Sequence, residues 1–253
     1  MILTVVGSGT LVPSARRSSP ALAITCDDFQ ATVDGGSGTL RRQAELGFDF
    51  RKTSALFFTH IHPDHTLDVL AFLFAQKVVG GESVQGEPVE IVGPPGFERY
   101  LEHLREGVRP WTDGGERGFR VVELEAGDVR RFGPVLVEAV RLEHAVVDHG
   151  YRFRSPSGGV AAFTGDTAWC DNLNVLAREA DLLIAECSGS REHTALSHLS
   201  APEVGRVATE AGVKQVVLTH LFPLPDDRVR LTEVAEEYSG PVLMAEDGTQ
   251  FWV

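Results

Sequence analysis

The sequence predicts an α/β protein in which two β-sheets pack together and helices cover their outer faces. Three observations favour this fold class. Apolar runs typical of strands and segments of helical spacing come in blocks, in the order strands, helices, strands, helices, rather than in strict alternation. The 253 residues are 43% hydrophobic and 23% charged, which leaves ample apolar surface for a core. No repeat, low-complexity tract or linker interrupts the chain, so we expect residues 1–253 to form a single domain.

Short apolar runs bounded by glycine, proline and polar residues predict the strands of the first half. These runs cover residues 2–6, 21–25, 30–33, 55–58 and 89–92. Helices are expected at 39–47, 64–77 and 97–104, and a glycine-rich loop at 113–118. The second helix is predicted from apolar residues at helical spacing: Leu67, Leu70, Ala71 and Phe74.

A second strand-rich block covers residues 119–164, and alternating helices and strands complete the chain. Within the block, strands are expected at 120–124, 135–142, 150–154 and 160–163. Beyond it, helices are expected at 173–179, 201–211 and 229–238, and strands at 182–185, 216–218 and 242–245. Ser200 and Glu203 form a capping-box pattern at the start of the helix at 201, which places His198 just before that helix.

Charge and cysteine content exclude several classes of protein. The 23 Lys and Arg against 36 Asp and Glu give a net charge of −13. Nonspecific electrostatic binding of nucleic acid over a broad surface is therefore not expected, although a local basic patch is possible. Three cysteines without CxxC spacing favour neither a disulfide framework nor a zinc ribbon. No apolar stretch approaches the ~18 residues of a membrane span and no basic leader is recognisable, so we expect a cytoplasmic protein.

The segment from Thr59 to His65 carries the strongest chemical signal. His60, His62, Asp64 and His65 place three imidazoles and one carboxylate within six positions, directly after an apolar strand. In a loop between strand and helix, His60 and His62 can face one way while Asp64 and His65 face the other, as two neighbouring cations require. A surface histidine cluster is the competing interpretation.

Further candidate ligands follow other predicted strands. His144 comes after the strand at 135–142, Asp166 after that at 160–163, and His220 after that at 216–218. Metal-competent side chains that recur at strand ends, where loops converge, are typical of a site rather than of a core. Together they supply the ligands that the first motif lacks.

These motifs resemble the metallo-β-lactamase fold hydrolases over nearly the whole chain, and within them the ribonuclease Z branch. The resemblance rests on the His60-x-His62-x-Asp64-His65 motif with His144, Gly165-Asp166-Thr167 and Thr219-His220, on the turn from Asp34 to Thr39, on Gly150-Tyr151, on Ala185-Glu186-Cys187-Ser188, and on His198-Leu199-Ser200-Ala201. It implies a four-layer αββα sandwich of two mixed sheets with helices on the outer faces. It also implies a homodimer.

The resemblance assigns roles to individual residues. It implies that His60, His62 and His144 bind one metal ion, that Asp64, His65 and His220 bind a second, and that Asp166 bridges the two. Asp64 is also implied as a proton acceptor, and His198, oriented by Glu186, as the donor of a proton to the leaving oxygen. Two divalent ions are expected per chain, Zn²⁺ in the first place, with Mn²⁺ or Fe²⁺ as alternatives.

One departure from the family pattern shapes the functional prediction. Members that process tRNA carry a long arm between the Gly-Tyr and Gly-Asp-Thr motifs, whereas residues 152–164 suffice here only for a hairpin. We therefore expect a phosphodiesterase that uses a metal-bridging hydroxide on a small phosphodiester, such as a cyclic nucleotide or short oligonucleotide. The alternatives are an ester, lactone or thioester hydrolase, a tRNA 3′-processing endoribonuclease, and a non-catalytic metal-binding ligand sensor.

Other polar residues near the motifs receive more modest interpretations. Asp34 is expected to orient the histidine loop or cap the adjacent turn, and Cys187 to be a small core residue. Arg16 and Arg17 either meet an anionic substrate or form a solvated pair. The remaining histidines considered are expected to be solvated or structural: His103, His149 and His193.

Overall fold

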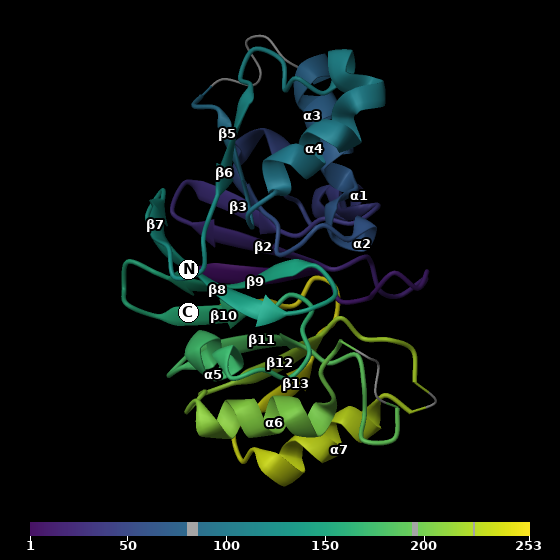
Figure 1. Cartoon of the computed structure of the whole chain (residues 1–253), viewed down its shortest axis with the longest axis vertical. Coiled ribbons are helices and arrows are strands. Elements are labelled where there is room, and N and C mark those ends of the chain that lie inside the picture. Colours follow the sequence, from purple (N-terminus) through teal and green to yellow (C-terminus); the bar gives the residue numbers. More distant parts are fainter. Residues whose placement is uncertain (80–85, 194–196, 225) are drawn as a thin grey trace.

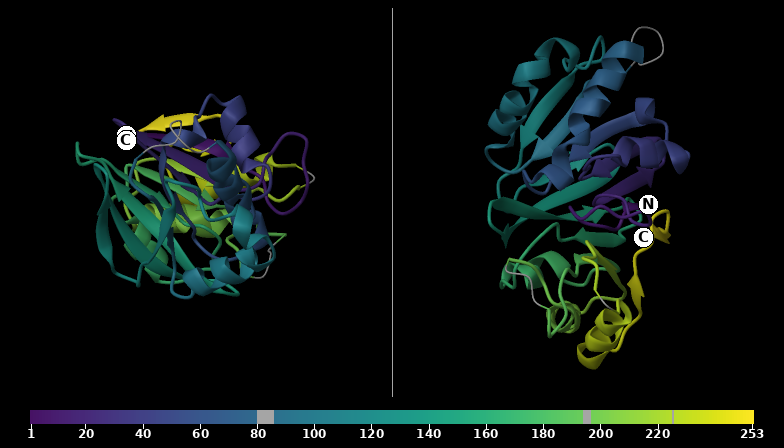
Figure 2. Two further views of the ribbon diagram at one scale, coloured as in Figure 1. Left: turned by 90° about the horizontal axis from the view of Figure 1, so that it is seen from above. Right: turned by 90° about the vertical axis from the view of Figure 1, so that its right-hand side faces the viewer.

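The computed structural model describes residues 1–79, 86–193, 197–224 and 226–253. Two mixed seven-stranded sheets lie face to face, and helices cover their outer sides (Figure 1). This confirms the predicted α/β class and the four-layer αββα arrangement. The first and last residues pair through Met1 N and Val253 O, 2.9 Å apart, so the termini lie together (Figure 2).

The first sheet has the order β14-β1-β2-β3-β4-β5-β6. Its strands are β1 (Ile2–Gly7), β2 (Ala21–Cys26), β3 (Phe29–Val33), β4 (Thr53–Phe57), β5 (Val89–Gly93), β6 (Phe119–Glu123) and β14 (Gln250–Trp252). Strands β3 to β6 run parallel, with Val33 opposite Phe57 and Phe57 opposite Val92. Their carboxyl ends therefore meet at one edge of the sheet, where loops can build a site.

The second sheet has the order β13-β12-β11-β10-β9-β8-β7. Its strands are β7 (Val129–Phe132), β8 (Val135–Glu143), β9 (Val147–Arg154), β10 (Val160–Phe163), β11 (Leu182–Glu186), β12 (Val216–Thr219) and β13 (Val242–Met244). Strands β10 to β13 are parallel, and β9 and β10 form the antiparallel hairpin expected between Tyr151 and Gly165. The carboxyl ends of β10, β11 and β12 again share one edge.

Helices bury the outer face of each sheet. They are α1 (Thr39–Glu45), α2 (Pro63–Thr66), α3 (Asp68–Val79), α4 (Phe97–Arg105), α5 (Asn172–Ala177), α6 (Ala201–Glu210) and α7 (Arg228–Glu237), with short 3₁₀ turns at Phe50–Lys52 and Glu106–Trp111. Apolar side chains of α3 and α4 pack on β4 and β5, and those of α5, α6 and α7 pack on β11 and β12. The capping box of Ser200 and Glu203 is present at the start of α6, as predicted.

The central core lies between the two sheets. Leu3 and Ile24 of the first sheet belong to the same buried cluster as Phe153 and Ile184 of the second. Each such side chain contributes about 1.5–3 kcal/mol by leaving water. This burial holds the two sheets together and so fixes the loops at their edges relative to one another.

The predicted helix at 64–77 is wrong in one respect, because the structure divides it into α2 and α3 at Leu67. The backbone N–H of Asp68 bonds to the carbonyl of Gly35 instead of continuing the helix, and the Asp68 carboxylate accepts from Gly38 N and Leu40 N. This bonding ties the metal-motif helix to the turn after β3.

Two predicted strands differ from the structure, and two further strands were not predicted. β6 belongs to the first sheet, parallel to β5, although the sequence placed it with the strand-rich block that forms the second sheet. β9 begins at Val147 rather than at residue 150. β7 and β14 were not predicted, because β7 is largely exposed and β14 has only three residues. Among the described residues, no helix combines the length and apolar character that crossing a bilayer requires.

Candidate metal centre

The histidine motif lies in the turn that joins β4 to α2. Pro63 occupies the first position of α2, where its missing N–H costs nothing, and His62 precedes it in extended conformation. His60 and His62 therefore lie before the helix, while Asp64 and His65 lie in its only turn. The arrangement separates the four side chains into two pairs, as the sequence predicted.

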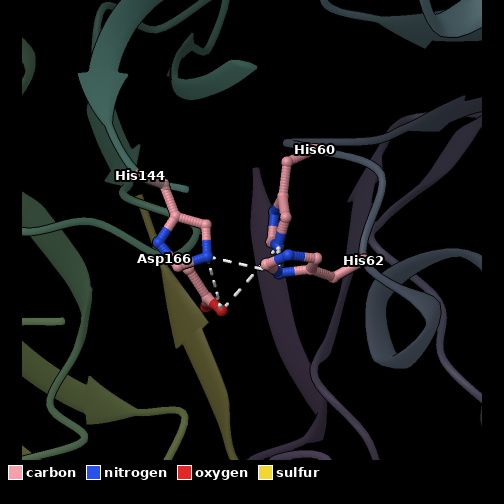
Figure 3. A group of neighbouring side chains, drawn as sticks. All are labelled: His60, His62, His144 and Asp166. Atoms are coloured by element: carbon pink, nitrogen blue, oxygen red, sulfur yellow. Dashed lines mark hydrogen bonds and ion pairs between the residues drawn. The ribbon is translucent and has the colours of Figure 1, made fainter. Parts of the chain in front are cut away.

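The first group of ligand atoms combines the first pair with two residues from the second sheet (Figure 3). His62 Nδ1 lies 3.0 Å from His60 Nε2 and 3.2 Å from His144 Nε2. Asp166 Oδ2 lies 3.8 Å from His60 Nε2 and 3.9 Å from His144 Nε2. Three imidazole nitrogens and one carboxylate oxygen thus converge on one point, the donor set of a four-coordinate zinc site.

The second group consists of Asp64, His65 and His220, again beside Asp166. Asp64 Oδ2 lies 3.8 Å from His65 Nε2 and 3.7 Å from His220 Nε2. Asp166 reaches both imidazoles, with Oδ2 at 3.4 Å from His65 Nε2 and Oδ1 at 3.3 Å from His220 Nε2.

The unpaired atoms of this second group test whether a metal ion fits. His65 Nε2, His220 Nε2 and Asp166 Oδ1 are buried and accept or donate no hydrogen bond within the described part of the chain. Buried polar atoms without partners are costly unless something else satisfies them. Two imidazole nitrogens and a carboxylate oxygen aimed at one another are the donors that a divalent cation takes, so the residues present fit a metal ion.

Three of the candidate imidazoles are held at the ring nitrogen that faces away from the cluster. His65 Nδ1 lies 2.9 Å from Asp34 Oδ2, and His144 Nδ1 lies 3.0 Å from the carbonyl of Ser197. His220 Nδ1 lies 2.9 Å from Ser188 Oγ. Such contacts place the proton on Nδ1 and turn the free electron pair of Nε2 toward the centre. The expected contact between Asp34 and the histidine loop is therefore present.

Backbone strain accompanies two of these residues. Asp34 and His220 adopt left-handed conformations, with φ of 56° and 51°. A non-glycine residue in this region costs free energy and persists only where surrounding contacts enforce it. Asp34 is enforced through Thr59, whose N–H and hydroxyl both bond to its carboxylate.

Electrostatics in the cluster favour a cation. Burial, and then the proximity of His65, hold the pKa of His60 well below the ordinary histidine value. Burial acts to raise the pKa of Asp166, but His220 and His65 outweigh it and hold that pKa well below the ordinary value. His60 is therefore a neutral imidazole and Asp166 an ionised carboxylate, the protonation states in which both bind metal. Burial acts to lower the pKa of His65, but the charges of Asp166 and Asp34 raise it well above the ordinary value, which shows how strongly the site attracts positive charge.

His198 and Glu186 lie beside this cluster. His198 Nδ1 is 2.9 Å from Glu186 Oε1, and a His198 ring nitrogen lies within 4.8 Å of ligand atoms of Asp166 and His220. Glu186 is buried and accepts further bonds from Thr167 N and from the N–H and hydroxyl of Ser188. Burial lowers the pKa of His198, but the hydrogen bond and charge of Glu186 prevail, so the net shift is upward. Glu186 therefore favours the protonated form of His198.

Three residues in contact with the cluster were not predicted from the sequence: Asp148, Thr59 and Ser188. Asp148 is fully buried, and its Oδ2 lies 3.0 Å from His60 Nδ1. It was missed because residues 145–149 read as a loop, in which an aspartate is unremarkable. Thr59 adjoins the motif and offered a positional signal, whereas Ser188 offered only its place two residues after Glu186.

The remaining polar residues fall outside the cluster. His103 and His193 are exposed, whereas His149 is buried and Cys187 packs in the core behind β11, as expected for it. Arg17 bonds to Ser8 Oγ and to the carbonyl of Ala245, and Arg16 is exposed. Both line a cavity of about 570 Å³, together with two arginines of α1, Arg41 and Arg42.

Comparisons with known proteins agree with this geometry. The model of the β-lactamase superfamily domain matches residues 31–221. Ribonuclease Z of Myxococcus xanthus is 29% identical over 301 residues, covering 97% of this chain and 95% of that protein. The uncharacterized protein ML1173 of Mycobacterium leprae is 30% identical over 260 residues, covering 98% and 87%.

Solved structures show the same fold. The metallo-β-lactamase fold protein YhfI from Bacillus subtilis matches with a TM-score of 0.84 at 25% identity, covering 99% of this chain and 98% of that one. The fold implies divalent metal binding, and the His/Asp cluster described above lies where its two sheets present their loops. The chain therefore belongs to the β-lactamase superfamily and is a metal-dependent hydrolase of the metallo-β-lactamase fold, related to ribonuclease Z.

Proposed function

We propose that this protein is a dinuclear phosphodiesterase that hydrolyses a small phosphodiester, such as a cyclic nucleotide or a short oligonucleotide. The position of Asp166 carries the proposal. Its Oδ2 faces His60 and His144 at 3.8 and 3.9 Å, while its Oδ1 faces His220 at 3.3 Å. One carboxylate shared by two ligand groups suits a pair of ions about 3.5–4 Å apart, the spacing found in metal-dependent phosphatases and nucleases.

The proposed ligands divide as the two groups do. His60, His62 and His144 would hold one ion, Asp64, His65 and His220 would hold the other, and Asp166 would serve both. We expect Zn²⁺, since imidazole and carboxylate are among its usual ligands, with Mn²⁺ and Fe²⁺ as alternatives. When bound, two such ions lower the pKa of a water and stabilise negative charge on phosphoryl oxygens.

Protein side chains supply the proton transfers. Burial acts to raise the pKa of Asp64, but the neighbouring His220 lowers it overall, so Asp64 is ionised and can accept a proton. His198 donates a proton to the leaving oxygen, and Glu186 orients its ring through the 2.9 Å contact at Nδ1. Because Nδ1 is engaged, Nε2 is the nitrogen that faces substrate.

The small substrate is favoured by two features of the chain. β9 and β10 are joined by a tight turn around residues 155–159, so no arm extends from this position to hold a tRNA body. The net charge of −13 offers no broad attraction for nucleic acid. The relative named Ribonuclease Z favours tRNA 3′ processing as a second candidate function.

Hydrolysis of bis-p-nitrophenyl phosphate by metal-analysed protein tests the proposal, with a p-nitrophenyl ester and a precursor tRNA as competing substrates. We expect cleavage of the diester, about two metal ions per chain, and loss of activity in Asp64→Asn. Asp113→Asn, an exposed carboxylate paired with Lys77, is the matched control and retains activity. Cleavage of the ester alone would refute the proposal, and cleavage of the tRNA alone would favour the second candidate. The homodimer stays a prediction for sedimentation analysis.

A further inference from the structure

Asp148 is a buried carboxylate that the proposed mechanism does not use. It lies on β9, and both Asp148 and His60 have side chains with no exposed surface. Asp148 Oδ2 is 3.0 Å from His60 Nδ1. In the described ranges neither carboxylate oxygen has a hydrogen-bond partner, so the approach to His60 Nδ1 is a close ion-pair contact without the geometry of a hydrogen bond. A carboxyl group buried at such cost and within 3.0 Å of a candidate ligand points to a role at that ligand.

Thr59 also approaches His60 Nδ1 and must be considered as the competing partner. Its Oγ1 lies 2.9 Å from this nitrogen. The same hydroxyl lies 3.1 and 3.0 Å from the two oxygens of Asp34. An ionised carboxylate accepts hydrogen bonds and has no proton to donate. The Thr59 proton is therefore committed to Asp34, so the hydroxyl can offer His60 only an acceptor. Thr59 therefore requires the proton of His60 to be on Nδ1, and an ionised Asp148 beside that nitrogen favours the same placement.

We infer that Asp148 is the positioning residue of the first metal group, holding His60 with its proton on Nδ1 and its Nε2 electron pair toward the ion. Asp34 stands in the corresponding place behind His65 of the second group. Each group then has one buried carboxylate behind one of its imidazoles. Thr59 connects the two, because it contacts both Asp34 and His60.

A purely structural role for Asp148 makes a different prediction from a positioning role. A core residue affects the free energy of unfolding and leaves the metal affinity of the folded protein unchanged. A positioning residue affects the affinity of one ion and leaves that of the other unchanged. Contacts behind metal-binding histidines typically change metal affinity by about 10–100-fold when removed. This inference rests on the metal-binding part of the proposed function and is independent of the substrate.

The experiment measures zinc affinity in metal-buffered solution, in two backgrounds that each leave one group intact. His220→Ala leaves the first group, and His144→Ala leaves the second. Adding Asp148→Asn is expected to weaken zinc binding by about 10–100-fold in the His220→Ala background and not in the His144→Ala background. Asp34→Asn, the matched control, is expected to show the reverse pattern. Equal affinity with and without Asp148→Asn in both backgrounds would overturn the inference.

A second measurement needs no variant. In zinc-loaded protein labelled with ¹⁵N, imidazole spectra report which ring nitrogen carries the proton. We expect a hydrogen-bonded proton on His60 Nδ1, with Nε2 bound to metal. A proton on Nε2, or a His60 Nδ1 proton that exchanges as fast as that of exposed His103, would overturn the inference. Failure of the parent protein to bind zinc would overturn both this inference and the proposed function, whereas zinc binding without diester hydrolysis would refute only the latter.

Discussion

Removal of the His198 side chain should affect substrates according to their leaving groups. In His198→Ala, a diester with an alkoxide leaving group loses its proton donor, whereas p-nitrophenolate departs as a stable anion and needs none. General acid catalysis contributes about 10²–10⁴-fold, so we expect a fall of this size in kcat for thymidylyl-thymidine. The fall for bis-p-nitrophenyl phosphate should stay within about tenfold, since that substrate loses only a contact.

The contact with Glu186 sets the size of a second, smaller effect. A hydrogen bond at 2.9 Å between an imidazolium and a carboxylate is worth about 1.5–3 kcal/mol, or roughly 10–150-fold. Glu186→Gln should therefore lower kcat for the dinucleotide by about this factor. Because Glu186 raises the pKa of His198, the rate declines as pH rises through that pKa, and in Glu186→Gln the decline should begin at lower pH.

Steady-state kinetics on both substrates, from pH 5 to 9, provide the assay. His193→Ala is the matched control, because His193 is an exposed histidine near the same loop. An equal fall in kcat for both substrates in His198→Ala would refute the role of proton donor. An unchanged alkaline limb in Glu186→Gln would refute the role assigned to Glu186.

Three further predictions concern stability and substrate charge. Burial, and then the charge of Arg141, lower the pKa of His149 to about 4 in the folded protein. As pH falls from about 6.5 toward 4, His149 is therefore protonated in the unfolded state but stays neutral in the folded state, which favours unfolding. Between pH 6.5 and pH 4 the free energy of unfolding should fall about 3 kcal/mol more in the parent protein than in His149→Phe. Urea unfolding at both pH values measures this, and an equal fall in the two proteins would refute it. Arg230 is fully buried and donates to the carbonyls of Cys187, Ser188 and Phe222. Arg230→Met should therefore lower the free energy of unfolding by about 3–5 kcal/mol, measured in urea, and a loss below about 1 kcal/mol would contradict this. If Arg16 meets an anionic substrate, one of the two roles that the sequence allows, Arg16→Glu should raise KM for a 5′-phosphorylated dinucleotide at least threefold and leave KM for bis-p-nitrophenyl phosphate unchanged. Equal changes in the two KM values would refute that role.

Most of the fold was predictable because its signals are local. Buried strands such as 182–185 are apolar runs in the sequence. The capping box of Ser200 and Glu203, a signal only four residues long, correctly predicted where α6 begins. The signals failed where tertiary bonds intervened. The backbone of Asp68 turns to Gly35 and divides a helix that the apolar spacing predicted as continuous. Strand β6 joins the first sheet although its composition resembles that of the strands that follow it.

The sequence by itself determined which residues form the candidate metal groups. Four of them occupy six consecutive positions, and the other three follow strands whose carboxyl ends must meet at a sheet edge. Only the tertiary structure decided how those residues are supported. Asp148 lies 88 positions from His60 and Arg230 lies 42 from Ser188, and nothing in the local sequence links either pair. The physical reason is that ligand spacing is imposed by a single turn of chain, whereas the partner behind each imidazole depends on how two sheets and their helices pack against one another.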